Sequence, residues 1–165
     1  MNAEEIPIIG AGKVAEVTIF RVIWTIRSRQ SFLSGLWLRD FHPGQPLWFN
    51  LFAHVLAKGQ NKYPFFRFYY KNIILLTPNE HFLLDQGTEE QRISYSLDVE
   101  EKSGGKNKAD WGRIEALRQE LLQEYDKYFP RRKGLIIGYK YSLEEQQQIV
   151  GMLNEKYIDD LKKNS

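Results

Sequence analysis

The chain contains no cysteine, which excludes disulfide bonds, a thiol nucleophile and any metal site built on thiolates. Only three histidines remain as strong nitrogen ligands, and their spacing matches no metal-binding pattern. We therefore expect neither a metal nor a cofactor. A chain without cysteine also fits a reducing compartment, and we expect the protein to be cytoplasmic.

Long apolar runs and a large net charge are missing as well. A membrane-spanning helix needs about 20 apolar residues, whereas the apolar runs here last only a few residues. Residues 1–6 show no basic stretch leading into an apolar one, so no secretory signal is predicted. The net charge of +2, from 23 basic and 21 acidic residues, gives no field typical of proteins that bind nucleic acid or anionic membranes.

The chain does carry ample material for a core. Its 165 residues are 42% hydrophobic and 14% aromatic. A chain of this length can bury roughly 70% of its unfolded surface, so it needs no metal or disulfide to fold. These proportions predict one domain that spans residues 1–165.

Most apolar segments have the composition or the alternation of β-strands. β-Branched and aromatic residues fit a pleated, half-buried surface, and alternation indicates one buried face. Turn residues separate these segments, and consecutive strands tend to pair. The predicted strands are 14–27, 32–41, 65–76, 81–85, 93–99 and 135–141, and they favour an antiparallel meander of five to seven strands.

Helical signals gather towards the C-terminus. Residues 108–129 carry apolar side chains at steps of three and four, which predicts a helix that ends before Pro130. Ser142 and Glu145 form a predicted capping box for a terminal helix up to about Leu161. A third helix is predicted over residues 47–58, although a strand fits there too. The expected fold is therefore α+β, with two C-terminal helices and one inserted helix packed on the sheet.

Two surfaces are candidates for binding a protein partner. Residues 40–44 form a rigid turn after a strand that presents aromatic and charged side chains, and functional residues often lie on such loops. On the predicted helix 47–58, polar residues four apart line one face. The residues concerned are Trp37, Arg39, Asp40 and His42 on the first surface, and Asn50, His54 and Lys58 on the second.

Basic residues are interleaved with aromatic residues between Tyr63 and Lys71. On a strand, every second residue from Tyr63 to Lys71 would share one face, which could stack bases and neutralise phosphates. This pattern defines an alternative function, nucleic-acid binding. The residues assigned to it are Arg67, Tyr69 and Lys71, with Arg131, Arg132 and Lys133 in a later loop.

An enzyme is the remaining alternative. Asp98, Glu100 and Lys102 would share a strand face, with Asp85 on the preceding strand, in a loose likeness to metal-dependent nucleases. A solvated sheet face explains the same pattern, and no phosphate-binding loop or nucleophile elbow is present. We therefore expect a non-catalytic binding module that recognises a protein partner, with self-association left open.

Overall fold

The computed structural model describes residues 13–57, 63, 66–129 and 142–163. Within these residues the fold is mostly helical, so the predicted five-to-seven-strand meander and the α+β class are wrong. The helices are α1 (Lys13–Ile26), α2 (Pro46–Phe49), α3 (Pro78–Gln86), α4 (Glu89–Lys102), α5 (Trp111–Tyr128) and α6 (Leu143–Lys163). The two strands are β1 (Phe52–His54) and β2 (Ile73–Leu75).

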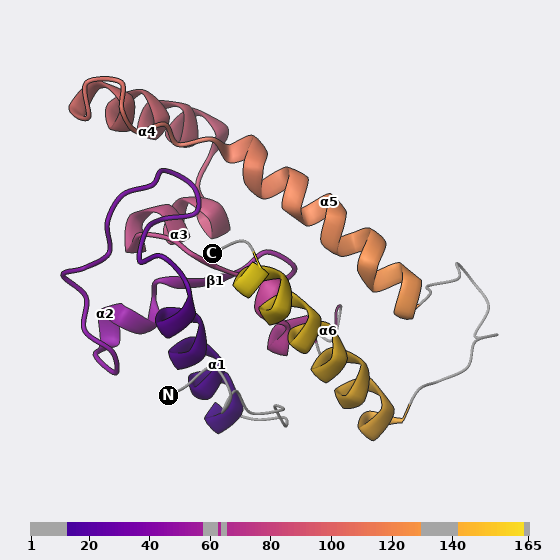
Figure 1. Cartoon of the computed structure of the whole chain (residues 1–165). Coiled ribbons are helices and arrows are strands. Elements are labelled where there is room, and N and C mark those ends of the chain that lie inside the picture. Colours follow the sequence, from indigo (N-terminus) through magenta and orange to yellow (C-terminus); the bar gives the residue numbers. More distant parts are fainter. Residues whose placement is uncertain (1–12, 58–62, 64–65, 130–141, 164–165) are drawn as a thin grey trace.

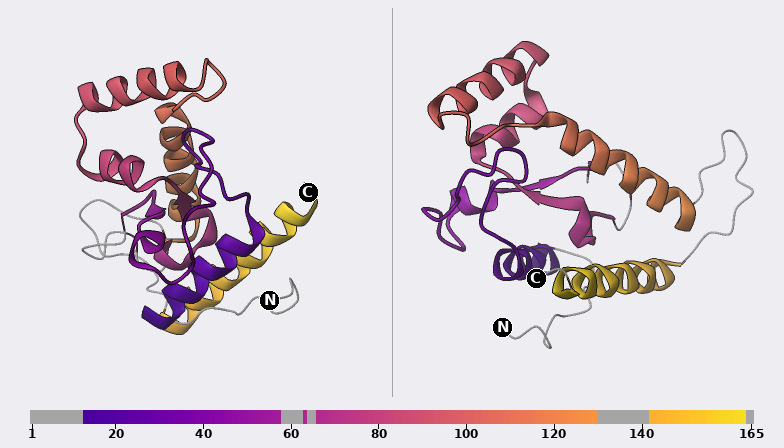
Figure 2. Two further views of the ribbon diagram at one scale, coloured as in Figure 1. Left: turned by 90° about the vertical axis from the view of Figure 1, so that its left-hand side faces the viewer. Right: turned by 45° about the horizontal axis from the view of Figure 1, so that its top comes forward.

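The two strands form a small antiparallel sheet at the centre of the molecule. Ala53 lies opposite Ile74, and both residues are buried. Helix α5 lies on one side of the strands, while α1 and α6 lie on the other (Figures 1 and 2). The sheet is therefore enclosed by helices rather than being the framework that the sequence predicts.

Residues 14–27, predicted as a strand, belong almost entirely to α1. Ile19, Val22 and Ile23 are fully or almost fully buried in the core. β-Branched residues lower helix propensity by only a few tenths of a kcal/mol each, which burial of this size outweighs. The Thr25 hydroxyl also donates to the Arg21 carbonyl oxygen (2.8 Å), as a helical threonine does.

The next two predicted strands are not extended either. Residues 32–41 form a loop, which turns at Gly35 with a φ of 77°, and Trp37 in this loop pairs with the preceding Gln30 in an isolated bridge. In the segment predicted as a strand over residues 65–76, two 3₁₀ turns, η2 (Phe66–Phe68) and η3 (Tyr70–Asn72), precede β2. Of the predicted strand 65–76, only the segment that forms β2 is therefore correct.

Helices α3 and α4 replace the predicted strands 81–85 and 93–99. Each begins with a capping box, formed by Thr77 with Glu80 and by Thr88 with Gln91. These caps satisfy backbone N–H groups at both helix starts and favour the helix over a strand. The alternating apolar residues of 93–99 consequently lie on opposite sides of α4.

The two predicted C-terminal helices are confirmed. Helix α5 follows the predicted stripe, and α6 begins with the predicted cap, in which the Glu145 N–H donates to the Ser142 hydroxyl (3.1 Å). The inserted helix 47–58 is wrong beyond its first turn, because α2 ends at Phe49 and β1 follows. The predicted strand 135–141 lies outside the described residues. No described helix has the length and apolar character needed to cross a bilayer.

Candidate functional site

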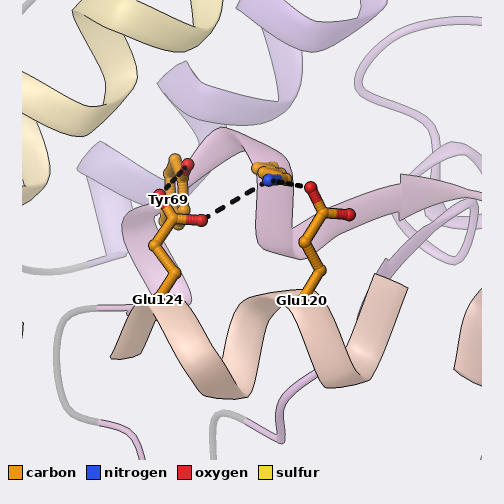
Figure 3. Close-up of polar contacts among 4 residues, drawn as sticks. Tyr69, Glu120 and Glu124 are labelled. Atoms are coloured by element: carbon orange, nitrogen blue, oxygen red, sulfur yellow. Dashed lines mark hydrogen bonds and ion pairs between the residues drawn. The ribbon is translucent and has the colours of Figure 1, made fainter. Parts of the chain in front are cut away.

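A charged cluster joins the central segment to α5. The Lys71 ammonium donates to Glu120 (2.8 Å) and lies 3.5 Å from Glu124, while the Tyr69 hydroxyl donates to Glu124 (2.8 Å). Figure 3 shows both glutamates pointing from α5 towards the chain around η3. Glu120 and Glu124 are four residues apart, which places them on one helix face.

Tyr69 and Lys71 hold their protons tightly. Burial and the bond to Glu124 raise the pKa of Tyr69. Burial alone would lower the pKa of Lys71, but Glu120 and Glu124 outweigh it and raise that pKa. General acid–base catalysis needs a pKa near the working pH. Neither group meets this condition at neutral pH, so the cluster is better suited to holding structure and charge than to proton transfer.

A hollow of about 340 Å³ lies beside this cluster. We call it the first hollow. Its volume is at the lower end of the range of small-molecule sites. Its wall is apolar along β2 and α5, with polar and charged groups at Arg27, Lys71 and Tyr157. The complete lining comprises Arg27, Ser28, Gln30, Phe32, Lys71, Ile73, Ile74, Leu75, Leu117 and Tyr157.

Two cations line the first hollow, and Arg27, unlike Lys71, has no carboxylate partner among the described residues. Its guanidinium donates to the carbonyl oxygens of Tyr70 and Ile73, and its carbon Cζ lies 5.4 Å from the Tyr157 ring centroid. Its Nε group is buried without a hydrogen-bond partner among the described residues. Burial lowers the pKa of Arg27, partly offset by Tyr157, but an arginine still keeps its charge at neutral pH.

No carboxylate in the described part of the chain forms an ion pair with Arg27. Charges taken out of water are usually paired. The position of this guanidinium is nevertheless well defined, because two backbone carbonyls and an aromatic ring hold it. The first hollow therefore combines an apolar wall with a fixed positive charge that no described carboxylate pairs with.

A second hollow, of about 290 Å³, shares Lys71 and Tyr157 with the first. It lies between α5 and α6 and carries both signs of charge, from Glu124, Lys156 and Asp160. Asn154 fixes α6 here, because its side chain accepts from the Tyr70 N–H (2.8 Å) and donates to the Phe68 carbonyl (2.9 Å). Because the second hollow carries both signs of charge, it selects less strongly than the first hollow for a ligand of one charge.

The residues of the first predicted partner surface are exposed. Trp37 is 55% exposed, and the Arg39 guanidinium stacks on its ring at 3.8 Å. Asp40 and His42 are exposed in the turn that follows. These four residues lie outside both hollows, so this surface and the first hollow are separate candidates.

The second predicted surface does not form, because the helix that would align it ends at Phe49. Asn50 is exposed, and its carbonyl oxygen lies 2.6 Å from Nδ1 of His81. His54 is half-buried on β1, with Nε2 3.0 Å from the Arg67 carbonyl oxygen. Lys58 lies outside the described residues.

The premise of the nucleic-acid alternative, a shared strand face, is also absent, because 3₁₀ turns replace the strand. Tyr69 is buried, and its ring is not available for stacking on bases. Arg67 pairs with Glu16 (3.1 Å), and Lys71 pairs with α5. Residues 131–133 lie outside the described part of the chain.

The nuclease-like arrangement depends on a strand that is instead α4. Residues two apart on a helix point in widely different directions, so Asp98 and Glu100 do not share a face. Asp98 pairs with Lys102 at 3.0 Å on the exposed surface. Among the described residues, no three histidine, aspartate or glutamate side chains gather closely enough to hold a metal ion.

Four residues of the site are missing from the sequence predictions: Arg27, Glu120, Glu124 and Tyr157. The spacing of Glu120 and Glu124 on a segment predicted to be helical is the one signal that could have drawn attention to them. Arg27 gave no such signal, because its partners lie more than 40 residues away along the chain.

Comparisons with protein-family models, curated proteins and solved structures find no match to this chain.

Proposed function

We propose that the protein is a non-catalytic binding module whose first hollow takes a small amphipathic carboxylate. The observation that carries this proposal is the charge of Arg27, which no described carboxylate neutralises, at the wall of a mainly apolar hollow. A ligand with an apolar body would cover Ile74 and Leu117, and its carboxylate would balance the guanidinium. The lack of cysteine is consistent with action in the cytoplasm.

Electrostatics favours an anion over other head groups. A neutral alcohol would leave the guanidinium uncompensated, and an ammonium would be repelled by it. The apolar wall contributes roughly 25 cal/mol for each Å² of ligand surface removed from water. Affinity should therefore depend on both the carboxylate and the apolar body of the ligand. In a purely apolar crevice, by contrast, the apolar body alone would set the affinity.

The test uses three probes with the same body, namely octanoate, octanol and octylamine. Each is titrated into ¹⁵N-labelled protein, and amide shifts along β2 and the Arg27 Nε–H signal are followed by NMR. We expect octanoate to shift both sets of signals and to bind at least tenfold more tightly than octanol, a difference of about 1.4 kcal/mol. Equal binding of all three probes would contradict the proposal.

Two variants and a control locate the site. Arg27→Gln removes the charge and should weaken octanoate binding at least tenfold. Because this variant also removes two backbone contacts, Leu117→Trp provides an independent test: it fills the first hollow from α5 and should abolish binding while Arg27 remains. Lys156→Gln, in the second hollow, should leave octanoate affinity unchanged. Undiminished binding by a folded Leu117→Trp variant would place the ligand elsewhere.

A further inference from the structure

Helix α4 carries two large apolar side chains on the face that points away from the protein. Ile93 is 54% exposed and Leu97 is 64% exposed. Glu90 and Glu101 are also exposed, and spacings of three or four residues place all four side chains in one row. We call Glu90, Ile93, Leu97 and Glu101 the outer face of α4. Figures 1 and 2 show α4 at the edge of the molecule, away from α1 and α6.

The opposite face of α4 holds the helix firmly in place. The Tyr95 hydroxyl donates to the buried Glu80 (2.7 Å), and the Trp111 indole N–H donates to Ser96 (3.1 Å). Arg92 donates to the carbonyl oxygens of Leu83 (3.0 Å) and Leu84 (3.1 Å) at the end of α3. Since α4 is ordered before binding, a partner would lose little affinity to ordering this surface.

The charges of α4 indicate which chemistry would complement its outer face. The helix contains five acidic and two basic residues, a net charge of −3. Asp98 and Glu100 have lysine partners, whereas Glu90 and Glu101 form no ion pair within the described part of the chain. These two glutamates flank the apolar pair about 16 Å apart, at 1.5 Å per residue.

A second copy of the chain fits this face poorly. If two outer faces packed in antiparallel fashion, Glu90 of one copy would approach Glu101 of the other at both ends. In parallel packing each glutamate would meet its own counterpart. Like charges brought together at an interface oppose association, so the occupant should carry the opposite charge.

We propose that the outer face of α4 docks an amphipathic helix of a protein partner that has an apolar centre flanked by lysine or arginine. Two helices packed side by side would bury Ile93 and Leu97 against the partner's apolar residues. The partner's cations would meet Glu90 and Glu101. This surface does not include any residue of the first hollow, so the inference is independent of the proposed ligand.

The test uses a synthetic 18-residue helical peptide with a leucine stripe and lysines at both of its ends. A matched peptide carries glutamate in place of each lysine. Binding of the fluorescently labelled peptides is measured by anisotropy at 50 and 300 mM NaCl. We expect the lysine peptide to bind at least tenfold more tightly than the glutamate peptide, with affinity that falls as salt rises.

Substitutions on α4 decide whether the peptide uses this face. Leu97→Ser should weaken binding at least fivefold, and Glu90→Gln with Glu101→Gln should remove most of the salt dependence. Because these side chains are exposed, the variants should keep the circular dichroism spectrum of the parent protein. Met152→Ser on α6 changes a side chain that is similarly exposed, at 50%, and should leave binding unchanged.

Two results would overturn the inference. One is a lysine peptide that binds the Leu97→Ser and Met152→Ser variants equally well. The other is a dimer of the unmodified protein, seen by sedimentation, that Leu97→Ser converts to a monomer, because a second copy would then cover the face.

Discussion

Tyr69 and Tyr70 are neighbours in the chain, and both are buried, but their hydroxyl groups differ. The Tyr69 hydroxyl donates to Glu124, whereas the Tyr70 hydroxyl is buried without a hydrogen-bond partner among the described residues. A buried polar group without a partner costs free energy, and removing it can be neutral or stabilising. The pair is therefore a controlled comparison at the scale of one residue.

We expect Tyr70→Phe to leave the free energy of unfolding unchanged or to raise it by about 1 kcal/mol. Tyr69→Phe should lower it by about 1–2 kcal/mol, because the substitution removes a hydrogen bond to a carboxylate. Urea denaturation followed by circular dichroism measures both values. A larger loss for Tyr70→Phe than for Tyr69→Phe would contradict this description of the core.

At the scale of the element, the starts of α3 and α4 have the same capping motif in different surroundings. Glu80 is fully buried and accepts from the hydroxyls of Ser31 (2.5 Å), Ser34 (2.5 Å) and Tyr95 (2.7 Å), besides the Thr77 N–H. Gln91 makes the equivalent cap on the surface. Glu80 thereby links α3 to α4 and to the preceding loop.

This difference predicts unequal costs for the same substitution. Glu80→Ala should lower the free energy of unfolding by about 2–4 kcal/mol, because several buried donors lose their acceptor together. Gln91→Ala should cost about 1 kcal/mol or less, as for an ordinary cap. Thermal and urea denaturation of the two variants measure the difference. Equal losses would show that Glu80 acts only as a cap.

At the scale of the whole molecule, several groups around the core lose stabilising protonation at high pH. Burial raises the pKa of Tyr70 to about 12, and burial with a carboxylate partner raises that of Tyr69 and Tyr95. The pKa values of these tyrosines in the folded protein exceed the ordinary tyrosine value of 10.0. As the pH rises, the tyrosine hydroxyls of the unfolded chain therefore lose their protons at a lower pH than those of the folded protein. The contribution of these tyrosines to stability is therefore constant below about pH 10 and is lost as the pH rises towards 12.

Lys71 acts in the same direction, because its raised pKa means that its ammonium group loses the charge of these ion pairs at high pH. We expect urea denaturation at pH 8, 10 and 11 to show stability that declines only above about pH 10. Tyr70→Phe should reduce the slope of this decline. A slope that is unchanged in that variant would show that the Tyr70 hydroxyl does not titrate with unfolding.

The candidate site was only partly predictable. Tyr69 and Lys71 are both identified from the sequence, but as members of an exposed strand that binds nucleic acid. Their actual partner, Glu124, lies more than 50 residues away along the chain. No local pattern encodes a pairing over that separation. The role of Arg27 in the first hollow is likewise evident only from the tertiary structure, in which its guanidinium donates to the carbonyl oxygens of Tyr70 and Ile73.

The sequence by itself determined α5 and the start of α6, because a period of three and four residues and a capping box are local signals. Tertiary structure decided the state of residues 14–27, whose β-like composition differs from their helical structure, and in residues 93–99 it added to the local capping box at the start of α4. In the first segment, burial on several sides outweighs the small propensity cost of β-branched residues. In the second, contacts to Glu80 and Trp111 hold a helix whose other face is left exposed.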